Sequence, residues 1–394
     1  MNDLIEIVEG KTRALVPNLE KYRIGRKIEP AHAPVFYNPA MELNRSLSVL
    51  AVEAYARLFN YKDLTVCEPL SGTGIRGLRY LNETSCVSRV IMNDIDEEAY
   101  KLIMLNVERS KAEDRVEIYN MDASQLLLNL RGRIIDVVDI DPFGSPIEFI
   151  YTAIRALRHR GLLAITATDV GVLMGRYPQK CVRRYGARPI YSIDYSREIG
   201  LRILVGAVAK MALQLDYGVK PLLCYYEGHY YRCFLMLLKD RSDAVSTVKN
   251  LGYLIHVRST SEVKFLRKYP ICKIARRDVD VGGPLWTGSI IDLDFVKEIY
   301  DVLNEREYIR SNGKLMKMVE DFIDEAPLSD IPYYTTSTIC RGLGTEISSK
   351  KLIEELRKAG IDASRTHMDS RGVRAGVEDV EVLREVALSV LERE

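Results

Sequence analysis

The sequence predicts an α/β fold built on a doubly wound, mainly parallel sheet, followed by a second, α+β domain. Three observations carry this prediction. Apolar β-type runs alternate with helical segments over the first part of the chain. A glycine-rich turn follows the first of these runs, and beyond about residue 240 the pattern changes to a basic segment followed by mainly helical stretches. A chain of 394 residues is long enough for two domains, which we expect at residues 1–240 and 241–394.

The N-terminal elements precede the sheet. Residues 4 to 16 alternate in polarity and turn at Glu9-Gly10, which predicts a short hairpin. Residues 38 to 59 show apolar positions at helical spacing, with Asn38 suited to cap the helix and Pro39 to its first position. Five apolar runs follow, at residues 64 to 70, 89 to 94, 115 to 122, 134 to 141 and 162 to 169. Because such sheets bind ligands at the carboxyl ends of their strands, the residues that end these runs are the candidate site.

The glycine-rich turn is the first candidate binding element. Gly72, Gly74 and Gly77 form a G-x-G-x-x-G pattern directly after the first predicted strand, so that backbone can approach a ligand there without a Cβ in the way. Asp94 ends the next predicted strand, where its carboxylate can accept hydrogen bonds from ribose hydroxyls. Together these features predict a cofactor that contains adenosine.

Two cofactors fit these residues. A nicotinamide dinucleotide would place its pyrophosphate at the loop, whereas S-adenosylmethionine has no phosphate and needs partners for a carboxylate and an adenine. Arg76 in the loop and Arg45 on the preceding helix could bind that carboxylate, and Asp122 could accept from the adenine amino group. These residues alone leave methyl transfer and dehydrogenase chemistry open, as well as simple solvation of Asp94 and Asp122.

The fourth apolar run ends in DIDPFGSP, residues 139 to 146, which favours methyl transfer to an amino group. An exocyclic base amine is a poor nucleophile because its lone pair is conjugated into the ring, so a catalyst must hold its N–H groups with fixed acceptors. Asp141 and Pro142 offer a carboxylate and a carbonyl side by side, and Phe143 offers a flat surface for stacking the base. The competing interpretation is a Pro-Phe turn with Asp141 as a capping residue, and Asp139 receives only a structural role.

Composition excludes several other classes. The seven cysteines contain no C-x-x-C pair and the five histidines show no ligand spacing, so we expect no metal. No apolar run approaches the roughly 18 residues that a membrane span requires, and no signal sequence is recognisable, so we expect a cytoplasmic protein. The net charge of +1 neither requires nor excludes nucleic acid.

Longer segments resemble the archaeal-type tRNA (guanine(26)-N2)-dimethyltransferase family. The matching segments occur in the family's order along nearly the whole chain: YNPAMELNRSLSV, LSGTGIRGLRY, DIDPFGSP, ATDVGVLMGRYPQKCVRRYGARP, REIGLRIL, GGPLWTG and SRTHMDSRGVRA. The resemblance implies a Rossmann-like class I methyltransferase fold and a C-terminal domain that docks tRNA. It further implies transfer of two methyl groups from S-adenosylmethionine to the N2 atom of guanosine 26, with no obligatory protein partner.

The resemblance also implies roles for individual residues. Asp141 would be the catalytic residue, with Phe143 beside the target guanine, and Ala123 would join the cofactor contacts at Arg45, Arg76, Asp94 and Asp122. Many relatives carry a cysteine cluster before the GPLW signature that resembles a zinc site, but this chain has only Cys272 there. Zinc is therefore not expected.

Two basic clusters are candidates for RNA contact. Residues 258 to 277 contain seven Lys or Arg residues against one acidic residue, and a second cluster lies at residues 176 to 188. The residues we assign to RNA binding are Arg267, Lys268, Arg276, Arg277, Arg183 and Arg184. Either cluster alone is equally consistent with a solvated surface. Methylation of another RNA or of DNA, and RNA binding without catalysis, are the alternative functions.

Overall fold

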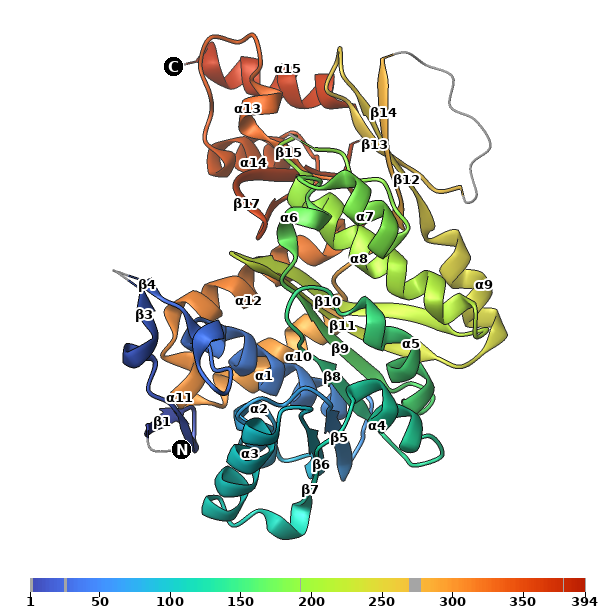
Figure 1. Ribbon diagram of the computed structural model, residues 1–394. Coiled ribbons are helices and arrows are strands. Elements are labelled where there is room, and N and C mark those ends of the chain that lie inside the picture. Colours follow the sequence, from blue (N-terminus) through green and yellow to red (C-terminus); the bar gives the residue numbers. More distant parts are fainter. Residues whose placement is uncertain (1–2, 25–26, 192, 269–277, 378, 394) are drawn as a thin grey trace. The chain divides into compact units, whose positions relative to one another are not determined.

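The computed structural model describes residues 3–24, 27–191, 193–268, 278–377 and 379–393. The chain forms two compact units (Figure 1). The first comprises Met1–Pro142, Glu148–Thr166 and Lys297–Met316, and the second comprises Phe143–Ile147, Ala167–Val296 and Lys317–Glu394. The units are interleaved along the sequence, and the expected division at residues 240 and 241 stays a prediction.

Five parallel strands form the core of the first unit, in the spatial order β9-β8-β5-β6-β7. Their bounds are β5 Leu64–Glu68, β6 Val87–Asn93, β7 Val116–Tyr119, β8 Val137–Ile140 and β9 Leu162–Ala167. All five apolar runs are thus confirmed as strands. Every side chain of β8 and β9 is buried, as expected for strands covered on both faces. The strand order reverses between β5 and β8, which is where doubly wound sheets bind their ligands.

One helix, α1, precedes these strands, and α2 to α5 connect them. Their bounds are α1 Glu42–Leu58, α2 Ile75–Glu83, α3 Glu97–Arg109, α4 Ala123–Asn129 and α5 Ile147–Ala156. The predicted helix at residues 38 to 59 begins with a 3-10 turn, Pro39–Met41, and the Asn38 side chain accepts from the Ala40 N–H as expected.

The predicted N-terminal hairpin is confirmed as β1 Leu4–Glu9 and β2 Thr12–Pro17, and a shorter pair, β3 Arg23–Ile24 and β4 Lys27–Ile28, follows it. Buried charges attach the hairpin to α2. The Glu83 carboxylate accepts from the Thr12 hydroxyl at 2.9 Å and from Arg79 Nε at 3.0 Å. Arg79 is fully buried and also lies 3.3 Å from Glu9. Because buried charges are stable only when paired, these contacts fix the place of the hairpin.

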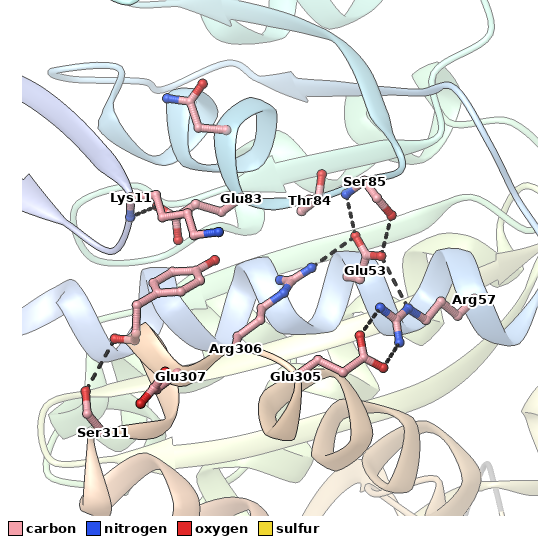
Figure 2. A pocket seen from close by; sticks show the side chains of 12 residues that line it. Lys11, Glu53, Arg57, Glu83, Thr84, Ser85, Glu305, Arg306, Glu307 and Ser311 are labelled. Atoms are coloured by element: carbon pink, nitrogen blue, oxygen red, sulfur yellow. Dashed lines mark hydrogen bonds and ion pairs between the residues drawn. The ribbon is translucent and has the colours of Figure 1, made fainter.

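A segment distant in sequence completes the first unit. It contains the end of α10 Leu293–Asn304 and α11 Glu307–Arg310. Figure 2 shows how Arg306 reaches Glu53 of α1 (3.3 Å) while Glu305 forms a double hydrogen bond with Arg57 (2.7 and 2.6 Å). These side chains line an open, polar cavity of about 830 Å³.

The second unit is mainly antiparallel in its sheets. β10 Gly218–Glu227 and β11 Tyr230–Leu238 form a hairpin. One three-stranded sheet has the order β13-β12-β14 and another the order β15-β17-β16. Their strands are β12 Leu251–Val257, β13 Val263–Leu266, β14 Val279–Trp286, β15 Tyr334–Thr335, β16 Ala363–Thr366 and β17 Asp369–Ala375.

The helices belonging wholly or mainly to the second unit are α6 Val170–Leu173, α7 Pro178–Tyr185, α8 Ser196–Leu213, α9 Arg241–Lys249, α12 Gly313–Glu325, α13 Thr336–Ile339, α14 Ser349–Lys358 and α15 Val380–Leu391. The mainly helical stretch expected after the basic segment is thus divided, between Leu293 and Glu325, into α10, α11 and α12. Asn312 ends one helical segment and begins the next, because its side chain accepts from the Leu315 N–H at 3.2 Å.

Buried arginines organise the core of the second unit. Arg202 of α8 donates to Glu198 (2.8 Å) and to the carbonyl oxygens of Gly288 (2.8 Å) and Ser329 (2.6 Å). Arg374 of β17 bridges two buried carboxylates, Glu198 (3.0 Å) and Glu325 (2.8 Å).

The carboxylate of Glu325 also accepts from the imidazole Nδ1 of His367 at 2.6 Å. Burial opposes ionisation of Glu325, but His367 and Arg374 hold the pKa of this carboxyl well below its usual range. The charge on Glu325 is therefore part of the folded core.

Removing Arg374 should strongly destabilise the protein, because Glu198 and Glu325 would lose a buried cation. We expect Arg374→Ala to lower the free energy of unfolding by about 3 to 5 kcal/mol. Arg371→Ala is a matched control on the same strand, since Arg371 is half exposed and its ion pair contributes at most about 1 kcal/mol. Urea unfolding of both variants measures the difference, and equal midpoints would contradict the structural role of Arg374.

Candidate active site

The glycine-rich turn lies at the carboxyl end of β5, as the sequence predicts. Gly72 and Gly74 both adopt positive φ angles, +54° and +75°, which side chains other than glycine rarely accept. A Cβ on Gly72 would also lie 3.1 Å from the carbonyl oxygen of Phe36. The backbone of this turn is therefore open to a ligand only because both positions are glycine.

Asp94 is connected to the same turn. One carboxylate oxygen accepts from the Gly72 N–H at 2.9 Å and the other accepts from the Asp96 N–H at 3.1 Å. Burial raises the pKa of Asp94, and the backbone hydrogen bonds oppose that increase. The structure thus brings two of the predicted cofactor residues, Gly72 and Asp94, into direct contact.

Asn93 joins the loops that follow three strands, and sequence reasoning did not identify it. Its amide donates to the carbonyl oxygens of Pro69 and Met121, both at 2.9 Å, and its oxygen accepts from the Met121 N–H at 3.1 Å. In the sequence, the one feature that pointed to Asn93 was its position directly before Asp94. This one buried side chain holds the loops after β5, β6 and β7 in register.

Asp122 and Ala123 lie at the third of these loops. The Asp122 carboxylate caps α4 by accepting from the Gln125 N–H at 2.9 Å, and the residue is exposed. Ala123 is buried as the first residue of α4. Asp122 therefore has a structural bond in addition to the adenine contact predicted for it.

Arg45 is buried and paired with Glu9 of the N-terminal hairpin. Its Nε donates to the Glu9 carboxylate at 2.7 Å, and its Nη2 bonds to the same carboxylate and to the Asn38 carbonyl oxygen. Two of its three nitrogens are thus committed to protein acceptors. Only Nη1 has no hydrogen-bond partner among the described residues.

Arg76 is the centre of the site. Its guanidinium is 3% exposed and bonds directly to the Asp141 carboxylate through Nη2. Its Nη1 donates to the Asn44 side chain at 2.8 Å and to the Ser48 hydroxyl at 3.0 Å. Arg76 was predicted to bind the carboxylate of a cofactor, and in the structure its guanidinium is bonded to Asp141.

Two further carboxylates face the same guanidinium. Glu68 lies 3.4 Å from Arg76 Nε and accepts from the Gly77 N–H at 3.1 Å, and Asp139 lies 3.7 Å from Arg76 Nη1. Asp139 is fully buried and accepts from the Tyr80 hydroxyl at 2.5 Å. Burial raises the pKa of Glu68 to about 8, Arg76 opposes this increase, and Asp139 and Asp141 add to it. Sequence reasoning did not identify Glu68 and Tyr80 as parts of the site.

The rest of the DIDPFGSP stretch crosses from one unit to the other. Pro142 is the last residue of its segment in the first unit, and Phe143 begins the second unit. Phe143 is 69% exposed. The following residue, Gly144, forms two hydrogen bonds of 2.8 Å with Thr168, one in each direction.

The basic residues assigned to RNA have different partners. Arg183 is exposed, whereas Arg184 donates to Asp169 at 2.9 Å. Arg267 pairs with Asp330 at 2.9 Å and is half exposed, and Lys268 is exposed beside it. Arg276 and Arg277 lie outside the described residues, as does Cys272. Within the described parts of the chain, no three His, Cys, Asp or Glu side chains are grouped to hold a metal ion.

Comparison with known proteins decides the family. The sequence model of the N2,N2-dimethylguanosine tRNA methyltransferase family matches residues 10–387. The chain belongs to this family. The resemblance noted in the sequence is thereby confirmed, and dehydrogenase chemistry is no longer an alternative.

Curated members of the family align along almost their full length. The tRNA (guanine(26)-N(2))-dimethyltransferase of Pyrobaculum arsenaticum is 42% identical over 354 residues, covering 89% of this chain and 91% of that protein. The corresponding enzyme of Pyrococcus abyssi is 35% identical and covers 94% of this chain and 96% of its own length.

A solved structure matches the fold. Trm1 from Pyrococcus horikoshii, determined as a complex with S-adenosyl-L-methionine, superposes with a TM-score of 0.85 at 33% identity, covering 97% of this chain and 99% of that one. The predicted class I methyltransferase fold is therefore confirmed. Among the described residues, no helix is both long and apolar enough to cross a membrane.

The residues at the strand ends fit this cofactor. Gly72 and Gly74 have positive φ angles, and a Cβ at either position would lie 3.1 to 3.3 Å from protein atoms. Asp94 is bonded to this turn, and its carboxylate has the chemistry to accept hydrogen bonds from ribose hydroxyls. The Nη1 group of Arg45 has the chemistry to donate to a ligand carboxylate. Arg76 fits less well as such a partner, because protein side chains already surround its guanidinium.

The titration of Glu68 gives a testable pH dependence. A folded-state pKa near 8, against an ordinary value of 4.5, means that the folded state binds the extra proton between these pH values. The free energy of unfolding contributed by Glu68 therefore falls as the pH rises through this window. Glu68→Gln removes the titration, so the stability advantage of the unchanged protein over the variant should shrink from pH 5 to pH 9. Thermal unfolding of both proteins measures it, and a pH-independent difference would refute the assignment.

Proposed function

We propose that this chain transfers two methyl groups from S-adenosylmethionine to the exocyclic N2 of guanosine 26 in tRNA, with Asp141 as the residue that holds the amine. The observation that carries the proposal is the bond between the buried Arg76 and the partly exposed Asp141 at the carboxyl end of β8. One oxygen of Asp141 is fixed by Arg76, and the other has no partner among the described residues. A rigidly held carboxylate with one unbonded oxygen can accept a hydrogen bond from an amino group.

Methyl transfer to this amine depends more on how the amine is positioned than on a strong base. When bound, S-adenosylmethionine supplies an electrophilic methyl carbon. Asp141 and the Pro142 carbonyl accept from the N–H groups of the amine, which directs the nitrogen lone pair at that carbon. As N2 gains the methyl group it gives up one proton, which the open oxygen of Asp141 can accept. The exposed ring of Phe143 supplies a stacking surface for the guanine.

The second methylation follows from the same arrangement. After one transfer the N2 atom still carries a hydrogen, so Asp141 can hold it again. This requires a new cofactor molecule and space for the first methyl group. Because a base inside folded tRNA is stacked, we also propose that the target guanosine leaves its stack to reach Phe143.

The cofactor contacts are proposed at the three strand ends. Gly72 and Gly74 allow close approach of the backbone, Asp94 accepts from the ribose, and Asp122 with Ala123 lies beside the adenine. Arg45 binds the methionine carboxylate through Nη1. The second predicted arginine, Arg76, contributes chiefly by fixing Asp141.

Two basic regions are proposed to contact tRNA phosphates. Arg267 and Lys268 lead into the segment that contains Arg276 and Arg277, and Arg183 and Arg184 lie on α7. The pairing of Arg267 with Asp330 and of Arg184 with Asp169 leaves both side chains partly exposed, so each can still reach a phosphate. The cytoplasmic location expected from the sequence stays a prediction.

Replacing the proposed acceptor should abolish methyl transfer without removing the cofactor. We expect Asp141→Ala to lower kcat on tRNA by about 10²- to 10³-fold, the usual cost of losing one preorganised contact in the transition state. The affinity for S-adenosylmethionine, measured by calorimetry, should change little. Asp114→Ala, at an exposed aspartate of the first unit, serves as control. Near-normal turnover of the Asp141 variant would rule out the assigned role.

Removing the basic cluster should weaken tRNA binding and make it less sensitive to salt. The quadruple alanine variant changes Arg267, Lys268, Arg276 and Arg277. The slope of log affinity against log salt should decrease by about one for each lost phosphate contact. A matched variant changes four basic residues of the first unit, namely Arg13, Lys21, Lys101 and Arg109. If both variants bind tRNA equally well, the cluster is only a solvated surface.

A further inference from the structure

One continuous stretch of the second unit contains basic residues but no acidic ones. Residues 170 to 191 contain five basic residues and no acidic one. Arg176, Arg183, Arg184 and Arg188 are exposed, and Lys180 is partly buried. Within the described residues, Arg184 is the one member of this set that forms an ion pair, with Asp169. The charge of the other four is therefore not neutralised within the described residues.

Two exposed aromatic side chains lie in the same stretch. Tyr177 is 55% exposed and Tyr191 is 60% exposed. Tyr191 lies beside Gly175, two residues before Tyr177, because a Cβ on Gly175 would lie 3.2 Å from the Cβ of Tyr191. A Cβ on Gly171 would lie 3.7 Å from the ring of Tyr177, so this ring rests against α6. Both aromatic residues thus extend from a fixed backbone into solvent.

Hydrogen bonds connect this stretch to the loop that carries Phe143. Gly144 bonds to Thr168 in both directions at 2.8 Å. Asp169, the next residue, accepts from the Tyr185 hydroxyl at 2.6 Å and from Arg184 at 2.9 Å. The loop after Phe143 and both ends of the α6–α7 segment are therefore parts of one hydrogen-bonded frame within the second unit.

We infer that Tyr177 and Tyr191 stack on unpaired bases of the RNA strand that adjoins the target guanosine, while the arginines beside them bind its phosphates. This inference rests on the proposed function, because it takes the guanosine to lie at Phe143. Aromatic side chains interleaved with arginines form the common surface for single strands, since every base offers a face for stacking. A nucleotide that leaves its stack also leaves its neighbours partly unstacked, and these neighbours need a new surface.

The composition of the surface favours RNA over a protein partner. The buried centre of a protein interface is depleted in charged side chains. Here the two aromatic residues alternate along the chain with basic residues instead, with no acidic residue from 170 to 191. RNA can bind both kinds of side chain, because its phosphates pair with arginines and its bases stack on aromatic rings.

The experiment compares leucine and phenylalanine at each tyrosine. Tyr177→Leu and Tyr191→Leu remove the ring, whereas Tyr177→Phe and Tyr191→Phe keep it. We expect each leucine variant to raise the KM for tRNA about tenfold, with the KM for S-adenosylmethionine unchanged, and each phenylalanine variant to behave as the unchanged protein. Tyr151→Leu is the control, since Tyr151 is an exposed tyrosine beside Arg155 on α5 of the first unit.

A second measurement reports stacking directly. A tRNA with 2-aminopurine next to position 26 should lose fluorescence on binding the unchanged protein, and regain it with the leucine variants. The inference is overturned if the leucine variants leave both KM and fluorescence unaltered, or if phenylalanine is as harmful as leucine. Thermal unfolding identifies any variant that is merely misfolded. If the unchanged protein transfers no methyl group, the proposed function fails on its own, while the fluorescence still decides whether these tyrosines stack on RNA.

Discussion

One buried cation, the guanidinium of Arg76, determines the geometry of the site. Glu68 at the end of β5, and Asp139 and Asp141 at the end of β8, all face it within the core of the first unit. Asp139 and Asp141, and Glu68 when it is ionised, would repel one another strongly without a cation between them, and burial would increase the repulsion. Arg76 therefore joins two strands and α2 at the point where the strand order of the sheet reverses.

The surroundings of this cation explain why the site can be rigid before any ligand binds. Asn93 fixes three loops through backbone groups, and Tyr80 holds Asp139 behind Arg76. Preorganised acceptors spare the reaction the cost of arranging them as the amine is methylated. The second unit contributes different properties, namely exposed aromatic rings and arginines of which most form no ion pair with the described residues, and these suit a large and flexible polyanion. The proposed function thus assigns positioning of the amine and binding of tRNA to different kinds of side chain.

The sequence predicted the parallel strands well, because their continuous apolar runs and the glycine turn between β5 and α2 are local signals. It predicted Asp141 and Asp94 as site residues for the same reason, since strand ends are visible in the pattern. It could not predict the partners of Arg76 or Arg45. Glu9 and Glu68 meet these arginines, and Tyr80 meets Asp139, only through the tertiary fold, and nothing in their own neighbourhood distinguishes them. The hairpin of β10 and β11 was likewise not predicted, because its nearly uninterrupted apolar residues lack the alternation of a strand with one exposed face.

The N-terminal hairpin has a consequence for the order in which the protein is made. Glu9 needs Tyr37 and Arg45, which follow it by 28 and 36 positions, and Thr12 needs Glu83, 71 positions further on. Because synthesis on the ribosome proceeds from the N-terminus, the hairpin emerges long before the charges that neutralise it. Its strands can pair early, but Glu9 must stay in water until α1 and α2 have left the exit tunnel. The hairpin is therefore translated before the residues of α1 and α2 that contact it, and its side-chain contacts with these helices should form late.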